Sequence, residues 1–408
     1  MSTLLLHLLF LAGMPCLVAE KSEDTHEKKR PDDQSKPNIL FIMADDLGYN
    51  DLDWKDPRLH TPVLRNLAFS GHSVLLSNSY VNQNLKTLGY KNYLIGKWHL
   101  GYCRKELLPT SRGFDYFYGY YGPQAGYFNH SADQYHRDLN RVVRGLDLFE
   151  EKSAGVSVPD FSKDGVYSSE LFAQQAQKML SLHDRTNPFF MFLSFQSVHP
   201  PLQNGGGAEF GASNYPLRGE KDTLWEGGTK TNTFVHAPRY IKEFDIRDEL
   251  FHVVDWHATL IGASGHNITS YGDGINQWDY LVTGNSTRRR TQFIYNIDEK
   301  GSAIRYGDFK LIFGSPDRKK TLRNSPFKLY KVSGISLCLA RSKRKDRCGA
   351  DDPGETKDLA KSHPLIVDRL KAKLFSMAQY TRKSIRVPIN LWGSPERLNG
   401  TYGSYWCL

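Results

Sequence analysis

The stretch Pro37–Trp54, "PNILFIMADDLGYNDLDW", decides the fold class of this 408-residue chain. Its apolar run has no alternation of apolar and polar residues, which indicates a strand buried on both faces, as in a parallel sheet. Other periodic segments follow it, with strand-like runs at 72–81, 91–101 and 188–202 and helical spacing at 61–71 and 168–184. Strands that alternate with helices predict a doubly wound α/β sheet.

The texture of the sequence changes beyond residue 284. Short alternating segments separated by polar turns, and then one amphipathic segment, follow at 288–297, 302–314, 326–332 and 363–383. The pattern predicts antiparallel strands with a covering helix. We therefore expect an N-terminal α/β domain over 37–284 and a smaller α+β domain over 285–408.

The start of the chain has the composition of a targeting segment. Residues 1–19 have a short apolar core and end on Ala19, which predicts a cleaved secretory signal; a buried helix is the alternative. Residues 20–36 are charged and almost free of apolar side chains, which predicts a disordered leader. No later segment is long and apolar enough to span a bilayer, so we expect a soluble product of the secretory pathway.

The chain is basic, with 53 Lys and Arg against 44 Asp and Glu, a net charge of +9. Clusters such as "TRRR" and "RSKRKDR" carry much of the excess and could attract polyanions such as sulfated glycans. Taken singly, each cluster is also compatible with a solvated loop. In a secreted protein, this charge points away from a nucleic-acid partner.

Four cysteines remain after removal of the signal, namely Cys103, Cys338, Cys348 and Cys407. An even number in an oxidising compartment allows three pairings, and the short spacing favours a local Cys338–Cys348 bridge. Four glycosylation sequons fit the same compartment, at Asn129, Asn267, Asn285 and Asn399.

Two adjacent carboxylates, Asp45 and Asp46, follow the first apolar run. Ligands of open α/β sheets gather at the carboxyl ends of the strands. Adjacent carboxylates repel each other, and oxygen ligands without a nearby cysteine favour a hard cation, Ca²⁺ or Mg²⁺. The plainer alternative is one capping aspartate beside a solvated one.

Cationic residues follow other apolar runs. "GKWHLG" places Lys97 and His99 two residues apart, on the same side of an extended segment. His199 follows the apolar part of the run at 188–202. Arg218 and Lys221 lie in a glycine-bounded loop. Each of these alone is compatible with surface decoration or a polar loop. Together with the acidic pair, they predict a site for an anionic substrate, with a cation and a histidine proton donor.

Six ordered motifs carry a resemblance to a known family: "PNILFIMADDLGYND", "GKWHLG", "PTSRGFDYFYGY", "VHPPLQ", "NYPLRGEKDTLWEGG" and "FHVVDWHATLIGASG". They resemble the type I sulfatases, and most closely the arylsulfatase B branch, from about Pro37 to the C-terminal tail. The resemblance implies an alkaline-phosphatase-like α/β sandwich around a mainly parallel sheet, with a small C-terminal domain. It also implies hydrolysis of sulfate esters in a lysosomal or extracellular setting, with Ca²⁺ and a formylglycine made from cysteine.

The resemblance assigns roles to seven residues of this chain. Asp45, Asp46 and Asn204 correspond to metal ligands. Lys97 and His99 correspond to the pair beside the nucleophile, His199 to a sulfate contact and Lys221 to the lysine near the leaving oxygen. The implied substrate is a sulfated small molecule or a glycan such as a sulfated glycosaminoglycan.

The chain departs from the family pattern at two places. The nucleophile signature, Cys or Ser followed by x-Pro-x-Arg, is absent from the sequence, and only Val81–Thr87 stands where it is expected. The formylglycine-generating enzyme therefore has no target residue. After His199, "VHPPLQ" runs directly into "NGGG", so that Gln203 stands where the family has a metal-binding aspartate.

Three hypotheses follow from these two gaps. The chain is an arylsulfatase by lineage that lacks catalytic competence, or a non-catalytic module that binds sulfated glycans, or an incomplete form of an active sulfatase. Loss of a nucleophile costs on the order of 10⁶ in turnover in other hydrolases, so we expect this chain to be inactive.

Overall fold

The computed structural model describes residues 36–69, 72–73, 81–136, 140–199, 212–247, 249–298, 301–316, 327–332, 352–381 and 390–407. The predicted signal peptide, nearly all of the predicted leader, Asn204 and the predicted Cys338–Cys348 bridge lie outside these residues. No helix in the described part of the chain is both long and apolar enough to cross a membrane.

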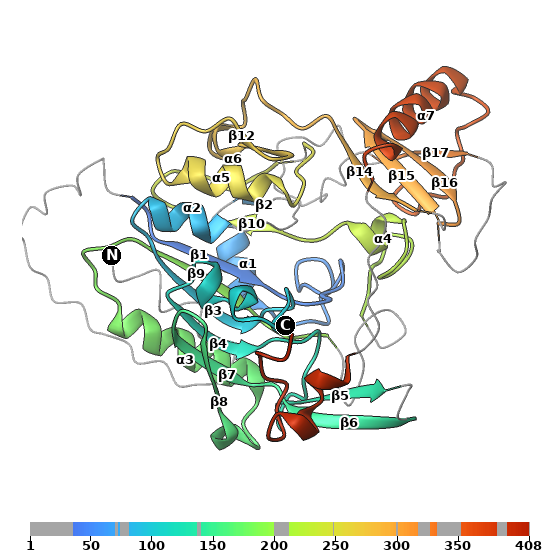
Figure 1. The fold of residues 1–408 in the computed structure, drawn as a ribbon. Coiled ribbons are helices and arrows are strands. Elements are labelled where there is room, and N and C mark those ends of the chain that lie inside the picture. Colours follow the sequence, from blue (N-terminus) through green and yellow to red (C-terminus); the bar gives the residue numbers. More distant parts are fainter. Residues whose placement is uncertain are drawn as a thin grey trace, which may run out of the picture.

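A six-stranded mixed sheet forms the centre of the molecule, with the strand order β1-β9-β3-β4-β7-β8 (Figure 1). Its strands are β1 (Ile39–Met43), β3 (Lys91–Lys97), β4 (Tyr116–Tyr120), β7 (Phe149–Ser153), β8 (Val156–Pro159) and β9 (Phe189–Ser194). The first four strands of the order are parallel to one another, whereas β7 and β8 are antiparallel to their neighbours. The predicted α/β class with a mainly parallel sheet is confirmed.

The prediction that the first strand is buried on both faces is wrong. β1 lies at the edge of the six-stranded sheet, its side chains are half-buried, and Ile42 is 36% exposed. β9, one strand further in, has the expected pattern, because it has neighbours on both sides and five of its six side chains are buried. An uninterrupted apolar run therefore marks membership of the sheet here, and not a central position in it.

Helices cover both faces of the central sheet (Figure 1). α2 (Val81–Thr87), α5 (Asp255–Ala263) and α6 (Trp278–Thr283) lie on one face, where Leu85 and Trp256 share a core with Leu94 and Phe190 of the sheet. α3 (Ser168–Leu182) lies on the other face, where Phe172 joins Ile95 and Met191. The alternation of these side chains along β3 explains how one strand supplies both cores.

The stretch that the sequence presents as a bare connection between two strands forms a helix. α2 begins at Val81, which the sequence pattern placed in a strand, and Val81, Asn82 and Leu85 are buried. The Asn82 side-chain amide donates to Arg112 O at 2.8 Å, and the backbone carbonyl of Asn82 accepts from the Asn92 side-chain amide at 2.7 Å. Burial of one face thus stabilises a helix that is too short to be stable alone.

Smaller elements surround the central sheet. They are α1 (Pro62–Phe69), the three-stranded sheet of β2 (His72–Ser73), β10 (Phe234–Val235) and β11 (Asp245–Ile246), the hairpin of β5 (Ser131–His136) and β6 (Arg141–Leu146), the short α4 (Glu226–Thr229) and the pair β12 (Ser270–Tyr271) and β13 (Gly274–Ile275). The three-stranded sheet contains strands from distant parts of the sequence.

A separate antiparallel sheet, covered by one helix, follows in the sequence (Figure 1). Its strands are β14 (Gln292–Ile297), β15 (Gly301–Tyr306), β16 (Phe309–Gly314) and β17 (Lys328–Lys331), and its helix is α7 (Pro364–Ala378). Leu370 and Leu374 of α7 pack against Ile304, Leu311 and Leu329 of the sheet. The predicted smaller α+β unit is confirmed; its boundary at residue 284 stays a prediction.

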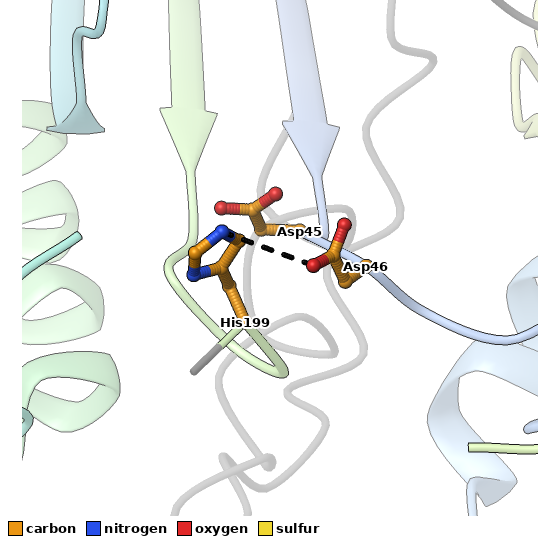
Figure 2. A group of neighbouring side chains, drawn as sticks. All are labelled: Asp45, Asp46 and His199. Atoms are coloured by element: carbon orange, nitrogen blue, oxygen red, sulfur yellow. Dashed lines mark ion pairs between the residues drawn. The ribbon is translucent and has the colours of Figure 1, made fainter. Parts of the chain in front are cut away.

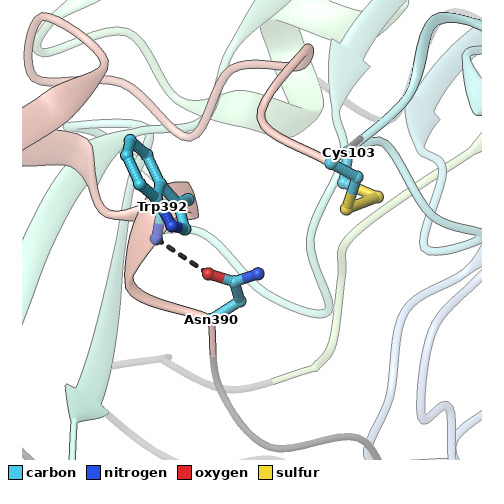
Figure 3. Close-up of a disulfide and its surroundings, with 4 residues drawn as sticks. Cys103, Asn390 and Trp392 are labelled. Carbon is cyan, nitrogen blue, oxygen red and sulfur yellow. Dashed lines mark hydrogen bonds between the residues drawn. A yellow bond between two sulfur atoms is a disulfide. The ribbon is translucent and has the colours of Figure 1, made fainter.

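The last described segment, 390–407, packs against the larger part of the molecule. Leu146 bridges Thr401, and the Tyr402 hydroxyl donates to Val143 O at 3.0 Å. A disulfide joins Cys103 to Cys407, and Figure 3 shows it together with Asn390 and Trp392 of the same C-terminal segment. This bridge is compatible with the expected Cys338–Cys348 pair.

One buried carboxyl group makes the stability of this fold sensitive to pH. The Asp147 carboxyl oxygens accept from Tyr121 N at 2.7 Å and from Gly122 N at 2.8 Å, and so tie the end of β4 to the start of β7. Burial raises the pKa of Asp147 to about 7, against these two hydrogen bonds, which lower it. The folded chain therefore keeps a proton that the unfolded chain, with its pKa near 3.8, releases.

The sign of this effect gives a testable prediction. The contribution of Asp147 to the free energy of unfolding is fully present below about pH 4 and is lost as the pH rises to about 7, by roughly 4 kcal/mol at most. Urea unfolding between these pH values should show this slope, and Asp147→Asn should lack it. Asp133→Asn, at an exposed carboxylate paired with Arg144, should keep the slope. Identical slopes in the wild type and Asp147→Asn would refute the assignment.

Candidate functional site

The carboxyl ends of three neighbouring parallel strands bring the predicted residues together. Asp45 and Asp46 follow β1, His199 follows β9, and Lys97 is the last residue of β3. Figure 2 shows the two aspartates and His199 just beyond the arrowheads of their strands. The loops after β1 and β9 are joined by backbone hydrogen bonds, from Asp45 N to Ser197 O and from Val198 N to Asp45 O.

Each of the two carboxylates has its own lysine. Lys97 Nζ donates to Asp45 Oδ2 at 2.6 Å, and both side chains are mostly buried. Lys221 Nζ donates to Asp46 Oδ2 at 2.8 Å from a more exposed position. His199 Nε2 lies 3.8 Å from the same Asp46 oxygen. The structure thus assembles five predicted residues in a charged cluster drawn from four segments of the chain.

The donor atoms fit a hard cation in part. Asp45, Asp46 and His199 each offer one atom, and these atoms lie within 4.8 Å of one another. Carboxylate oxygens are the ligands that Ca²⁺ and Mg²⁺ prefer, whereas an imidazole nitrogen suits transition metals better. The two aspartates therefore fit the predicted cation, and His199 fits the predicted contact with an anion. The third predicted ligand, Asn204, lies outside the described residues.

The close approach of β3 to β9 at the end of β3 requires a glycine. Gly96 pairs with Ser194 of β9 and has a φ of 105°, and a Cβ at this position would overlap Ser194 O. The left-handed conformation at the last turn of the strand suits glycine, which has no Cβ penalty there. Gly96 thus allows β3 to deliver Lys97 to the site against β9.

His99 joins the site in a different way from the one its spacing predicts. Its φ is 51°, so the chain turns at His99 and is not extended through it. The His99 amide donates to Tyr121 O at 3.1 Å. Burial lowers the pKa of His99, and Lys97 lowers it further, while Asp45 acts in the opposite direction. The imidazole is therefore held toward its neutral form among the charges of the site.

The structure adds a supporting residue that the sequence does not reveal. The Tyr127 hydroxyl lies 2.9 Å from His199 O and 3.1 Å from Gln196 O, shares its one proton between these carbonyls, and so fixes the turn that carries His199. Burial raises the pKa of Tyr127, so the hydroxyl stays a donor. No pattern around Tyr127 signals this role, since the contact joins segments about seventy residues apart.

Arg218, from the same loop as Lys221, is turned away from the carboxylates. Its guanidinium lies 3.9 Å from the centre of the Trp225 ring, and it donates to Glu355 O at 3.4 Å. Among the described residues, both cysteines are engaged in the Cys103–Cys407 bridge. The nucleophile signature is absent from the sequence, so the described site consists of the charged residues alone.

Comparison with known proteins gives consistent similarities. The sulfatase family profile matches residues 78–206. Arylsulfatase J of Mus musculus is 28% identical over an alignment of 493 positions, which takes in 91% of this chain and 80% of the relative. N-acetylgalactosamine-6-sulfatase of Homo sapiens is 24% identical, over 61% of this chain and 66% of the relative.

A solved structure has the same fold. The crystal structure of Ps i-CgsB in complex with k-i-k-neocarrahexaose superimposes with a TM-score of 0.66 at 18% identity, covering 90% of this chain and 98% of that one. The likeness confirms the alkaline-phosphatase-like fold of sulfatases for this chain, with its smaller C-terminal unit.

Proposed function

Because this chain belongs to the type I sulfatase family, we propose that it binds sulfate esters of glycans beside a calcium ion and, as its sequence stands, leaves them intact. The observation that carries the proposal is the cluster of two carboxylates, two lysines and two histidines, which lies at the carboxyl ends of β1, β9 and β3 and takes Lys221 from the loop before α4. The residues that correspond to the family's anion contacts lie in this cluster, which supports the proposal, and the nucleophile signature is not in the sequence.

The two lysines of the cluster have two possible partners, the aspartates and a bound sulfate group. Lys97 and Lys221 now donate to Asp45 and Asp46 at 2.6 and 2.8 Å. A calcium ion bound by the two aspartates would offset the negative charge of a sulfate group. The lysines would then turn their ammonium groups toward the sulfate oxygens, and His199 would donate to another. The His99 imidazole, which burial and Lys97 hold toward its neutral form by lowering its pKa, would donate a hydrogen bond to the bridging ester oxygen.

The proposed compartment is the secretory pathway, with the lysosome or the extracellular space as destination. All four sequon asparagines, Asn129, Asn267, Asn285 and Asn399, are exposed, as attachment of a glycan requires. The Cys103–Cys407 bridge suits an oxidising compartment.

The calcium proposal predicts a stabilisation that depends on Asp46. At a hundredfold excess over its dissociation constant, Ca²⁺ should raise the free energy of unfolding by about 2.7 kcal/mol. A thermal melt with and without Ca²⁺ measures this shift, which Asp46→Asn should abolish. Asp133→Asn, which changes an exposed carboxylate on β5, should retain it. An equal Ca²⁺ shift in Asp46→Asn would place the ion elsewhere.

A sulfated-glycan affinity column tests the binding proposal. The wild type should elute at higher salt than Lys221→Ala, because Lys221 provides a specific contact within the site. Lys178→Ala makes the same change of charge at an exposed position on α3 and should elute close to the wild type. Elution of all three proteins together at low salt would show that the column retains the protein through its net charge and not through the site.

A second candidate is that this chain is one form of a gene whose complete product is an active sulfatase. The alignment with arylsulfatase J favours this candidate. It has 493 positions but takes in only 91% of the 408 residues of this chain, so many of its positions are gaps in this chain. The relative therefore has residues that face gaps in this chain. Reading transcripts across Val81–Thr87 and beyond His199 tests this candidate; an additional segment with the nucleophile signature would support it.

A further inference from the structure

Four charged side chains lie buried together between the loop that carries Lys221 and the C-terminal sheet. Glu226 begins α4, Arg305 lies on β15, Lys310 lies on β16, and Glu355 lies in the segment before α7. The side chains of Lys310 and Glu355 are fully buried, and the other two are 6% exposed. Buried charges are tolerated only when they are paired, so loss of one member of this cluster would leave another buried charge uncompensated.

Lys310 connects the two buried carboxylates. Its Nζ lies 3.0 Å from Glu226 Oε1 and 2.9 Å from Glu355 Oε1. The Tyr295 hydroxyl also donates to Glu226 Oε1 at 2.7 Å, and Glu355 Oε2 accepts from Glu226 N at 2.6 Å. Arg305 lies 3.5 Å from Glu226 Oε2. Removal of the Lys310 charge would leave Glu355 without the ion pair to Lys310 and Glu226 with Arg305 as its remaining ion-pair partner among the four buried residues.

The cluster fixes the loop on the C-terminal side of Lys221. Leu224 and Trp225 pack in one core with Ala303, Ile312 and Tyr330 of the small sheet. The amide of Leu224 donates to Pro316 O at 2.7 Å. Two residues of this loop therefore have the small sheet as their support, directly beside Glu226.

Hydrogen bonds also join the two ends of the loop 218–229 that carries Lys221. Gly227 N donates to Arg218 O at 2.7 Å, and Thr223 Oγ1 donates to Glu220 O at 2.7 Å. A Cβ at Gly227 would overlap the backbone oxygens of Arg218 and Gly219, so the two ends of the loop touch. Lys221 lies between these contacts, and its Nζ reaches Asp46. The position of α4 thus determines where Lys221 stands.

We propose that Lys310 is a positioning residue for the sulfate site, which holds Lys221 against Asp46 through Glu226 and the closed loop 218–229. The inference rests on the proposed function, since it assigns to the C-terminal sheet a part in binding the anion. Lys310 itself touches neither the carboxylates of the site nor the anion. Its effect is transmitted through the backbone between α4 and Lys221.

Lys310→Met tests the inference, with two readouts on the full chain. We expect the backbone amides of 218–230 to exchange with deuterium about tenfold faster, while those of β3 and β9 keep their protection. We also expect about tenfold weaker binding of a monosulfated chondroitin disaccharide in the presence of Ca²⁺. Tyr295→Phe removes a single hydrogen bond to Glu226 and should change both readouts in the same direction by about twofold to threefold.

Arg290→Met is the matched control. It breaks another buried ion pair, in which Arg290 Nη2 lies 2.6 Å from Asp255 Oδ1, outside the Lys221 loop. A merely structural change of this kind should lower the melting temperature and leave both readouts as in the wild type. If Lys310→Met fails to fold, Tyr295→Phe decides by the same two readouts.

The outcomes separate the inference from the proposed function. If the wild type binds no sulfated disaccharide, the proposed function fails, while the exchange of 218–230 still reports on the loop. Folded Lys310→Met or Tyr295→Phe with wild-type exchange in 218–230 would overturn the inference. So would wild-type affinity in these variants while Lys221→Ala loses binding.

Discussion

The chain as its sequence stands should release no sulfate from a chromogenic aryl sulfate, even when it is co-expressed with the formylglycine-generating enzyme. The residues that we propose to contact a sulfate lie at the ends of β1, β9 and β3 and in the loop of Lys221, but no cysteine or serine begins the x-Pro-x-Arg signature. Without an attacking oxygen on the protein, no covalent sulfo-enzyme forms. The expected loss is on the order of 10⁶ in turnover relative to a complete sulfatase.

The measurement is the rate of aryl sulfate cleavage in the presence of Ca²⁺, over hours and at high protein concentration. A sulfatase that has the nucleophile signature, produced in the same cells, shows that the modifying enzyme is active. Asp46→Asn serves as the matched variant, because any genuine turnover should fall with it. Turnover that requires Ca²⁺ and is lost in Asp46→Asn would contradict the prediction.

Removal of the Cys103–Cys407 bridge should lower the free energy of unfolding by roughly 2–5 kcal/mol. The bridge joins residues 304 positions apart, so it strongly restricts the unfolded chain. It also holds the segment 390–407, whose Tyr405 and Cys407 amides donate to Cys103 O. Urea unfolding of the double variant Cys103→Ala with Cys407→Ala measures the effect.

Trp392→Ala is the control for this variant. Trp392 lies in the same C-terminal segment as Cys407, but its side chain is 64% exposed, and the hydrogen bond to Asn390 comes from its backbone (Figure 3). We expect a change below about 1 kcal/mol from this substitution. Equal unfolding curves for the double cysteine variant and the wild type would show that the tail is held by packing alone.

The sequence predicts the central sheet because its signals are local. The runs around Leu94 and Met191 are apolar over the length of one strand, and a parallel sheet brings their carboxyl ends to one edge. That rule suffices to bring Asp45, Lys97 and His199 together, which the structure confirms. The edge position of β1 was not predictable in this way, because an apolar run does not tell how many neighbours a strand has.

The parts that the sequence does not reveal depend on contacts between distant residues. Lys310 reads as an ordinary lysine of an alternating strand, yet it is fully buried because Glu226, 84 residues earlier, faces it. α2 reads as a polar connection, and only its burial against the core makes it a helix. Long-range pairing of this kind leaves no periodic signal in a single sequence.

Calorimetric titration with a monosulfated chondroitin disaccharide, followed by analysis of the same sample for free sulfate, tests the central claim most directly. We expect binding that requires Ca²⁺, is weakened by Lys221→Ala and leaves the ester sulfate on the sugar. Absence of binding in the presence of Ca²⁺, or release of free sulfate in proportion to the protein, would contradict it.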